Sequence, residues 1–445
     1  MWVLLVIAGV GAAAAGAQVL PAATDSLASW CEAGVAHDTA LGSGTIAFAT
    51  RLAELGPRPA AGEGEARARA AVVSELEAIG LEVSTEPFDY QSFVLEKTTL
   101  QLGGTPVEPV KIGLDPFSNT LAFTGEAVVV TDPAQAGPEI TGRIVVTNHP
   151  FMQLMISESA PAVVITVAPA DLETFAAGGN LEVSLEVEGK PVVLKSANVV
   201  ARYGSRPTSG REILVTSHID AYQDSPGAND NGTGLGLMIE LARAFVQFAD
   251  QLDVPLTFVA FGGEENGAIG SRAYVQSHVA ELDRIAAVVN LDTLGGAMGP
   301  VIATKPADEQ SPPQEPGVHI PAELQGRAWE GPDGRWMILH PEIIPAAFSS
   351  YYPEWLHTVV TQSASDLGIE VVHLDLISDH RTFALSGVPA ISIQSKEHHI
   401  HSKDDTADVL VPETVTSDAR LAAKILCELQ GASDQPPHEA PVPES

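Results

Sequence analysis

Short apolar runs alternate with longer amphipathic segments along the second half of the chain. The short runs predict buried strands at 213–217, 256–261, 285–291 and 390–394. The longer segments space their apolar residues as on one face of a helix, and they predict helices at 234–249, 274–282, 354–367 and 413–429. Because this alternation is typical of the α/β class, we expect a doubly wound mixed sheet with helices on both faces.

The first part of the chain predicts a shorter set of elements. Helical spacing covers 46–55 and 63–79, and the second helix is expected to stop at Gly80, a common residue after a helix. The segment 56–59, which reads Gly-Pro-Arg-Pro, predicts a loop between the two helices. Alternating polar and apolar residues then predict a strand at 82–88.

The pattern changes from residue 97 to residue 195. Short Val, Ile and Thr runs, for example 127–131, 143–147 and 162–166, are separated by Gly and Pro. This texture predicts a small, mainly β module inserted into the α/β domain, which is thereby divided into 24–96 and 196–431. The Pro- and Gly-rich segment 310–336 is expected to leave the sheet, and 432–445 to form a flexible tail.

The N-terminal segment predicts export. Residues 1–24 contain no charged side chain, an apolar core spans 2–10, and small residues follow at 12–17. This favours a cleaved signal peptide over residues 1–17, and therefore a secreted or periplasmic protein without stable membrane insertion. An uncleaved membrane anchor is the alternative, although the apolar core is shorter than the roughly 20 residues that span a bilayer.

Composition narrows the class of protein. The chain has 445 residues, enough for two domains or for one large domain with an insertion. Acidic residues outnumber basic ones by 57 to 23, so the surface repels phosphate backbones and nucleic acid is not expected as a partner. The two cysteines, Cys31 and Cys427, exclude a disulfide scaffold and a cysteine-rich metal site. Whether they form one bridge stays open at this point.

Residues able to bind a metal ion follow every predicted strand of the second half. They are His218, Asp220, Asp230, Glu264, Glu265, Asp292, His398, His399 and His401. Ligands of doubly wound sheets lie beyond the carboxyl ends of the strands, so these side chains are expected at one edge. Imidazole and carboxylate together suit zinc. Since two adjacent carboxylates are costly without a compensating charge, one of Glu264 and Glu265 could bind metal while the other does acid–base work. Asp220 could orient the imidazole of His218.

Six segments, in order, carry a resemblance to a known family. They lie at 216–220, 227–234, 261–267, 290–292, 378–380 and 401–406, so they span about residues 200 to 410. Together they resemble the secreted di-zinc aminopeptidases related to glutamate carboxypeptidase II and the transferrin receptor, which include bacterial leucyl aminopeptidases. Residues 51–59 are similar to the N-terminal segment of that family, and the insertion at 97–195 resembles a protease-associated domain.

The resemblance implies two zinc ions per chain. The first would be bound by His218, Asp230 and Asp292, and the second by Asp230, Glu265 and His401. His401 is preferred to His398 and His399 because Asp405 and Thr406 follow it at the family's spacing. Two zinc ions, three carboxylates and one hydroxide sum to zero charge, which supports a dinuclear site.

Further roles follow from the same resemblance. Glu264 would be the general base and Asp220 would orient His218, with Asp379 and Asp405 as candidates for hydrogen bonds to the ligands. The peptide bond between Asp230 and Asn231 is expected to be cis.

The implied function is a zinc-dependent exopeptidase that hydrolyses peptide bonds with a dizinc-bound hydroxide. The low number of arginines near the motifs favours an aminopeptidase over a carboxypeptidase. A glutaminyl cyclase-like acyltransferase with one zinc and a non-catalytic binding homologue are alternatives, and the complete ligand set argues against both. Ile400 stands where some members have a tyrosine. The oxyanion partner therefore stays open between His380 and a residue of 297–352.

Overall fold

The computed structural model describes most of the α/β region and of the insertion. The described residues are 26–38, 41–113, 120–132, 140, 143–148, 163–173, 175, 179–204, 210–296, 299–302, 329–330, 336–337, 353–373, 378–395 and 399–430. The predicted signal peptide and the predicted tail lie outside these residues, as does nearly all of the predicted excursion at 310–336.

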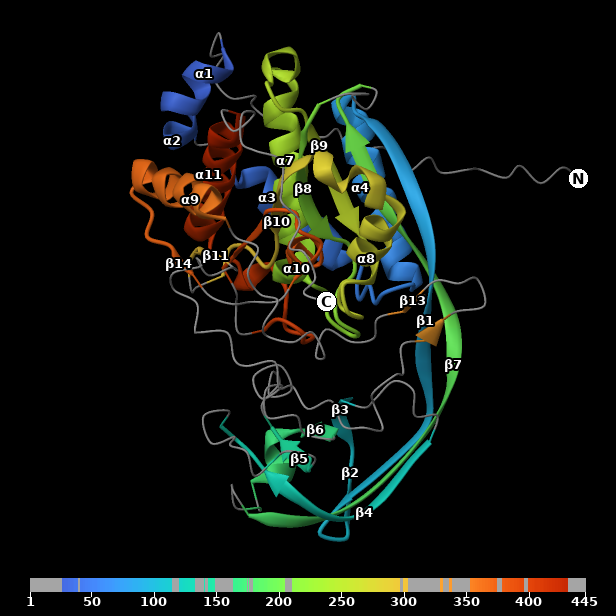
Figure 1. Ribbon diagram of the computed structural model, residues 1–445. Helices are drawn as coiled ribbons and strands as arrows, with labels where there is room; N and C mark the ends of the chain where they lie inside the picture. The colour runs from blue at the N-terminus through green and yellow to red at the C-terminus, as the bar shows by residue number, and fades with distance from the viewer. Residues whose placement is uncertain are drawn as a thin grey trace, which may run out of the picture.

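Within the described chain, one 13-stranded mixed sheet runs through the molecule, in the order β14-β11-β15-β10-β8-β9-β7-β4-β5-β6-β3, with β1 and β2 paired beside β7 (Figure 1). Its strands are β1 (Glu82–Leu102), β2 (Thr105–Val107), β3 (Pro109–Gly113), β4 (Thr120–Val129), β5 (Ile144–Thr147), β6 (Val163–Val167), β7 (Asn180–Arg202), β8 (Glu212–His218), β9 (Leu256–Phe261), β10 (Ile285–Leu291), β11 (Val301–Ile302), β14 (Val372–His373) and β15 (Ala390–Gln394). A separate pair consists of β12 (Trp329–Glu330) and β13 (Trp336–Met337).

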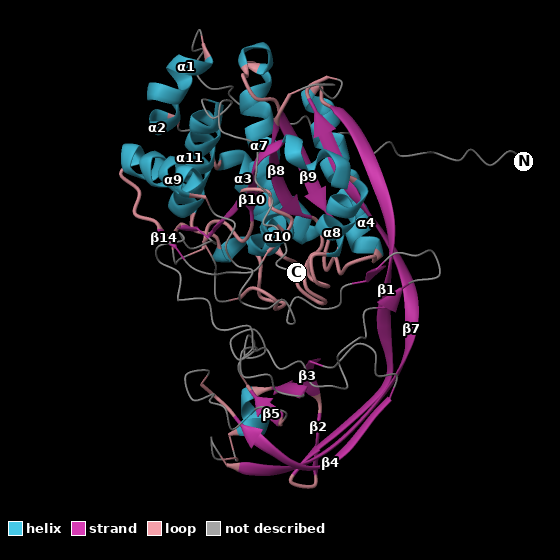
Figure 2. Ribbon diagram, in the orientation of Figure 1, coloured by secondary structure: helices cyan, strands magenta, loops and turns pink. Residues whose placement is uncertain are grey.

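Helices cover both faces of the strands β8, β9, β10 and β15, which run parallel (Figure 2). The α-helices are α1 (Leu27–Ser29), α2 (Val35–His37), α3 (Ser43–Glu54), α4 (Glu63–Ile79), α6 (Pro169–Leu172), α7 (Gly234–Val246), α8 (Ile269–Ser277), α9 (Glu354–Leu367), α10 (His380–Leu385) and α11 (Pro412–Gln430). The π- and 3₁₀-helical turns are η1 (Trp30–Gly34), η5 (Ala228–Thr233), η6 (Ala249–Gln251), η7 (Val279–Arg284) and η10 (Ala407–Val409).

Alternate residues of the strands enter two different cores. Ile213 and Val215 of β8 belong to the core that contains buried residues of α3, α4, α7, α9 and α11. Leu214 lies between them in sequence and packs on the opposite face, with Tyr274 of α8 and Phe383 of α10. Because side chains of a strand point alternately to its two faces, a fully apolar strand requires cover on both. The predicted mixed sheet with helices on both faces is confirmed.

The helix expected at 274–282 is displaced. α8 begins at Ile269 and ends at Ser277, and the chain continues as the 3₁₀ turn η7. The earlier start follows from packing, because Gly270 lies so close to the backbone of Gly262 that a Cβ there would clash with it. Such a contact between the helix and the end of β9 is tertiary, so the spacing of apolar residues does not reveal it.

A long antiparallel ribbon joins the α/β lobe to a β-rich lobe (Figure 1). The strand predicted at 82–88 continues as β1 to Leu102, and it pairs with β7 from Glu82 opposite Arg202 to Leu102 opposite Val183. The strands predicted at 127–131, 143–147 and 162–166 correspond to β4, β5 and β6, which pack their apolar residues into a separate small core. The domain limits 97 and 195 fall inside β1 and β7 and stay a prediction.

Among the described residues, no helix combines the length and the apolar character that crossing a membrane requires.

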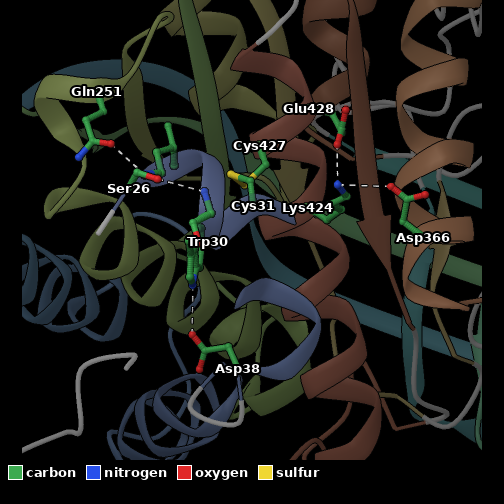
Figure 3. Close-up of a disulfide and its surroundings, with 11 residues drawn as sticks. Ser26, Trp30, Cys31, Asp38, Gln251, Asp366, Lys424, Cys427 and Glu428 are labelled. Atoms are coloured by element: carbon green, nitrogen blue, oxygen red, sulfur yellow. Dashed lines mark hydrogen bonds and ion pairs between the residues drawn. A yellow bond between two sulfur atoms is a disulfide. The ribbon is translucent and has the colours of Figure 1, made fainter. Parts of the chain in front are cut away.

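A disulfide bond ties the first described helical segment to the last helix (Figure 3). Cys31 of η1 is bonded to Cys427 of α11 across 396 residues of sequence. Trp30 beside it is buried, packs edge-on against Phe245, and approaches Asp38 through its indole N–H at 3.5 Å. The pairing of the two cysteines, which the sequence left open, is therefore a disulfide bond.

We expect no free thiol in the denatured, unreduced protein, because its two cysteines are bonded to each other. Thiol titration in guanidinium chloride measures this directly, with the reduced protein as the positive control. Replacing both cysteines by serine is expected to lower the free energy of unfolding by about 2–5 kcal/mol, since the cross-link restricts the unfolded chain. Two reactive thiols before reduction would contradict the bridge.

Candidate metal centre

Metal-competent side chains collect where the parallel strands end. β8 ends at His218, and Asp292 directly follows β10. Glu264 and Glu265 come shortly after β9, and the π-helical turn η5 carries the buried Asp230. Because the carboxyl ends of parallel strands meet at one edge of the sheet, these side chains lie together although they are far apart in the sequence.

The first group contains His218, Asp230 and Asp292, which are all buried. Nε2 of His218 lies 3.2 Å from Oδ1 of Asp230 and 3.3 Å from Oδ1 of Asp292. The three residues each offer one ligand atom, and these atoms lie within 4.8 Å of one another.

The second group contains Asp230, Glu265 and His401. Nε2 of His401 lies 3.1 Å from Oδ2 of Asp230 and 3.2 Å from Oε2 of Glu265. Asp230 therefore turns one carboxylate oxygen toward each imidazole and belongs to both groups. Among the described residues, the structure assembles the five predicted ligands in the two predicted sets. His399 is exposed, and His398 lies outside the described residues.

The charges at this edge fit a bound cation. Oδ1 of Asp230 and Oε1 of Glu265 are buried and accept no hydrogen bond from the described residues. Burial raises the pKa of Glu265, and nearby Asp230 raises it further, while His401 opposes the rise. Burial also disfavours ionised Asp230, but its contacts with His218 and His401 hold its pKa below the ordinary value. Oxygen and imidazole nitrogen in these two sets are the donors that zinc prefers.

The imidazoles respond to the same charges. Burial lowers the pKa of His401, but contacts with Glu265 and Asp230 outweigh that effect and raise the pKa to about 10. Burial likewise opposes protonation of His218, and Asp220, Asp230 and Asp292 nonetheless raise its pKa well above the ordinary value. In both imidazoles the balance therefore favours positive charge beside the carboxylates, an environment that would also stabilise a metal cation.

Asp220 joins the loop after β8 to the loop after β9. Its two carboxylate oxygens accept the backbone N–H groups of Glu264 at 3.0 Å and Glu265 at 3.1 Å. Its carbonyl oxygen lies 3.1 Å from Nδ1 of His218, while its carboxylate is 3.7 Å from the same nitrogen. Asp220 thus contacts His218 mainly through its backbone, and its side chain fixes the two glutamates.

Asp405 holds the backbone of η5 in a similar way. Its carboxylate accepts the N–H of Asn229 at 2.7 Å and that of Asp230 at 3.0 Å. Burial raises the pKa of Asp405 to about 7 in spite of these hydrogen bonds. Asp379 is also buried, which raises its pKa to about 7, and it belongs to neither ligand group.

The peptide bond between Asp230 and Asn231 is cis, as predicted. The side chain of Asn231 ties this turn to its surroundings: its amide donates to Ser217 Oγ at 3.0 Å and to the carbonyl of Leu291 at 2.9 Å. Its carbonyl accepts the N–H of Gly234 at 3.0 Å, at the start of α7. The carboxylate that belongs to both groups is therefore carried by a turn with contacts to β8, β10 and α7.

Three residues that contact the site were not among those predicted from the sequence. Arg58, in the predicted loop before α4, is buried under the loop that follows β8. Tyr222 stacks on the ring of His401 with 4.8 Å between centroids. Tyr90 of β1 accepts a hydrogen bond from the amide of Asn266 at 3.0 Å, next to the glutamate pair. Arg58 lies in the segment 51–59, and the similarity of this segment to the N-terminal segment of the family was the one sequence feature that pointed to Arg58. No pattern marks the two tyrosines.

Relatives with curated descriptions match parts of the chain. The "Probable lipoprotein aminopeptidase LpqL" of Mycobacterium tuberculosis is 28% identical over 264 residues, which cover 50% of this chain and 52% of that protein. "Aminopeptidase YwaD" of Bacillus subtilis is 44% identical over 85 residues, covering 19% of this chain and 18% of that protein. The chain therefore spans about half, or less, of the length of these curated relatives.

Solved structures match over more of the chain. An aminopeptidase from Aneurinibacillus sp. strain AM-1 superposes with a TM-score of 0.58 at 19% identity, covering 86% of this chain and 92% of that one. The zinc aminopeptidase BSAP from Bacillus subtilis gives a TM-score of 0.57 at 18% identity, covering 87% and 95%. At these identities the likeness concerns the fold.

A family match covers most of the residues described above. Residues 198–315 match the description "Peptidase family M28", and this range includes four of the five assembled ligands and Glu264. Together with the fold and the partial matches to aminopeptidases, this match shows that the segment 198–315 is similar to peptidase family M28.

Proposed function

We propose that this protein is a zinc aminopeptidase with two zinc ions per chain. The observation that carries the proposal is the pair of three-residue groups that share Asp230. Matches to proteins described as aminopeptidases and to a structure described as a zinc aminopeptidase support it. His218, Asp230 and Asp292 would hold one ion, and Asp230, Glu265 and His401 the other.

The protein's own groups determine how such a site works. Zinc, when bound there, supplies activation of water and polarisation of a scissile carbonyl. Glu264 is our candidate for the general base: it takes a proton from the attacking water and delivers it to the departing amine. It is partly exposed, which suits contact with a substrate, and Asp220 fixes its backbone through the N–H at 3.0 Å.

The alternatives have less support. A one-zinc acyltransferase or a non-catalytic homologue has no use for two complete groups around one shared carboxylate. A carboxypeptidase differs from an aminopeptidase in which end of the peptide it recognises. The excess of acidic over basic residues favours attraction of a free α-amino group.

The oxyanion partner was predicted to come from His380 or from the segment 297–352. His380 is buried on α10, and most of 297–352 lies outside the described residues.

We also propose an extracellular or envelope location and a protease-associated domain for the insertion at 97–195. The apolar N-terminal segment supports the location, and so does the description of one relative as a lipoprotein. The separate apolar core of β4, β5, β6 and β7 supports an insertion that packs as its own unit.

A peptide with a free amino terminus is expected to be hydrolysed from that end. Its N-acetylated form should be inert and its C-amidated form should react normally, because an aminopeptidase recognises the α-amino group. Mass spectrometry of the products over time identifies the end that is attacked. Hydrolysis of the acetylated peptide together with inertness of the amidated one would instead show a carboxypeptidase.

The zinc content of two variants tests whether Asp230 is shared by both metal ions while Asp292 binds only one. The wild-type protein should bind close to two zinc ions, since its ligands form two groups. Asp292→Asn should retain one ion, because it damages only the first group, whereas Asp230→Asn damages both and should retain neither tightly. Elemental analysis after dialysis against dilute zinc measures the content. Equal zinc loss in the two variants would contradict the sharing of Asp230.

Glu264→Gln is expected to keep both zinc ions and to lower kcat by about 10²–10⁴-fold, because the amide is isosteric but cannot accept the proton. Glu77→Gln is the matched control, since Glu77 is exposed on α4. Steady-state kinetics and zinc analysis are made on the same samples. A kcat close to that of the wild type would exclude Glu264 as the base.

A further inference from the structure

Arg58 lies buried beneath the loop that connects β8 to η5. Its side chain is fully buried, and its guanidinium donates to the carbonyl of Ile219 at 2.9 Å through Nε and to that of Gly227 at 2.7 Å through Nη2. Nη1 donates to the carbonyl of Pro226. The planar fork of an arginine can hold several acceptors in fixed directions, which an ammonium group cannot do.

These carbonyls stand at the two ends of one loop. Ile219 follows His218 directly, and Gly227 precedes the turn that carries Asp230. The guanidinium therefore joins the backbone just after the first proposed ligand to the backbone just before the shared one. Those two ligands meet at 3.2 Å, from Nε2 of His218 to Oδ1 of Asp230. The distance between them depends on how far apart the loop ends are held.

The loop is packed onto Arg58 with little free space. The carbonyl of Arg58 accepts the N–H of Ala221 at 3.0 Å, so its backbone and its side chain both bind the loop. Gly227 has φ +64°. A Cβ there would lie closest to the carbonyl oxygen of Asp230, and it would also lie 2.6 Å from Cβ of Ala221 and 2.8 Å from Nη2 of Arg58. A glycine is thus required where the loop crosses the guanidinium.

The charge of Arg58 acts on the carboxylates through space. The three hydrogen bonds of its guanidinium described above go to neutral carbonyl groups, and burial lowers the pKa of Arg58. Asp405, Asp230, Asp220 and Glu265 oppose that fall. A guanidinium keeps its proton in proteins. It therefore supplies a fixed positive charge behind the ligands, whether or not a metal ion is bound.

We infer that Arg58 is a positioning residue of the metal centre, which sets the separation of His218 and Asp230 by holding both ends of the loop between them. This inference rests on the proposed zinc site. It assigns to the segment before α4 a part in metal binding, beyond its part in the fold. Groups that hold a ligand in place commonly contribute about 10–100-fold to metal affinity.

The test compares Arg58→Lys with wild type and with Arg69→Lys. Lysine keeps the charge and loses the fork, so zinc should bind about 10–100-fold more weakly. Arg69 on α4 is the matched control, because its side chain is 19% exposed and contacts Glu65 rather than the loop. Zinc dissociation constants come from competition with a chelator, and unfolding temperatures are measured with and without zinc.

The outcomes separate the inference from the proposed function. Wild-type protein that binds no zinc would refute the zinc site itself. Wild-type affinity in Arg58→Lys, with equal falls in the unfolding temperature with and without zinc, would overturn only the role of Arg58. If Arg58→Lys does not fold, Arg58→Gln is measured in its place, and a loss of at least the same size is expected. Failure of both variants to fold in saturating zinc would show a role in the fold alone and would also overturn the inference.

Discussion

Several carboxylates lie close together at the buried edge where the parallel strands end. Asp220, Asp230 and Asp292 are all buried, and Glu264 and Glu265 lie beside them. Ionised carboxylates in such a place repel each other and lose their hydration, so each one needs a donor or a cation. The loops around the site supply hydrogen-bond donors to these carboxylates.

Backbone N–H groups supply several of the hydrogen bonds that these buried carboxylates require. Asp220 and Asp405 each accept hydrogen bonds from two successive residues, 264–265 in the first case and 229–230 in the second. In both cases the acceptor comes from a different loop than the donors. The same hydrogen bonds that stabilise buried charge therefore fix Glu264 and Glu265 relative to the end of β8, and Asp230 relative to the loop that carries Asp405. The carboxylates of Asp230 and Glu265 accept none of these amides and lie instead against the imidazoles of His218 and His401.

Sequence patterns predicted the parts of this arrangement that depend on local order. The strands β9, β10 and β15 have the predicted limits, because a short, mainly apolar run is typical of a strand covered on both faces. The proposed ligand set was implied by the resemblance, because only the family's spacing to Asp405 and Thr406 distinguished His401 from the two nearby histidines. The start of α8, the length of β1 and the contacts of Arg58 depend on packing between distant segments, which no local pattern contains.

The order of the chain gives the segment before the insertion a direct connection to the site. Arg58 precedes the ribbon of β1 and β7, whereas the five proposed ligands follow it. The ribbon closes where Glu82 pairs with Arg202, so the chain leaves the α/β lobe and returns to it at neighbouring positions. That closure lets an insertion of this length separate Arg58 from Ile219 and Gly227 without separating them in space. The ribbon itself also contacts the site, since Tyr90 of β1 binds Asn266 beside the glutamate pair. The segment before the insertion and the ribbon that carries it thus both contact the loops that hold the proposed ligands, and neither is only an attachment for the β-rich lobe.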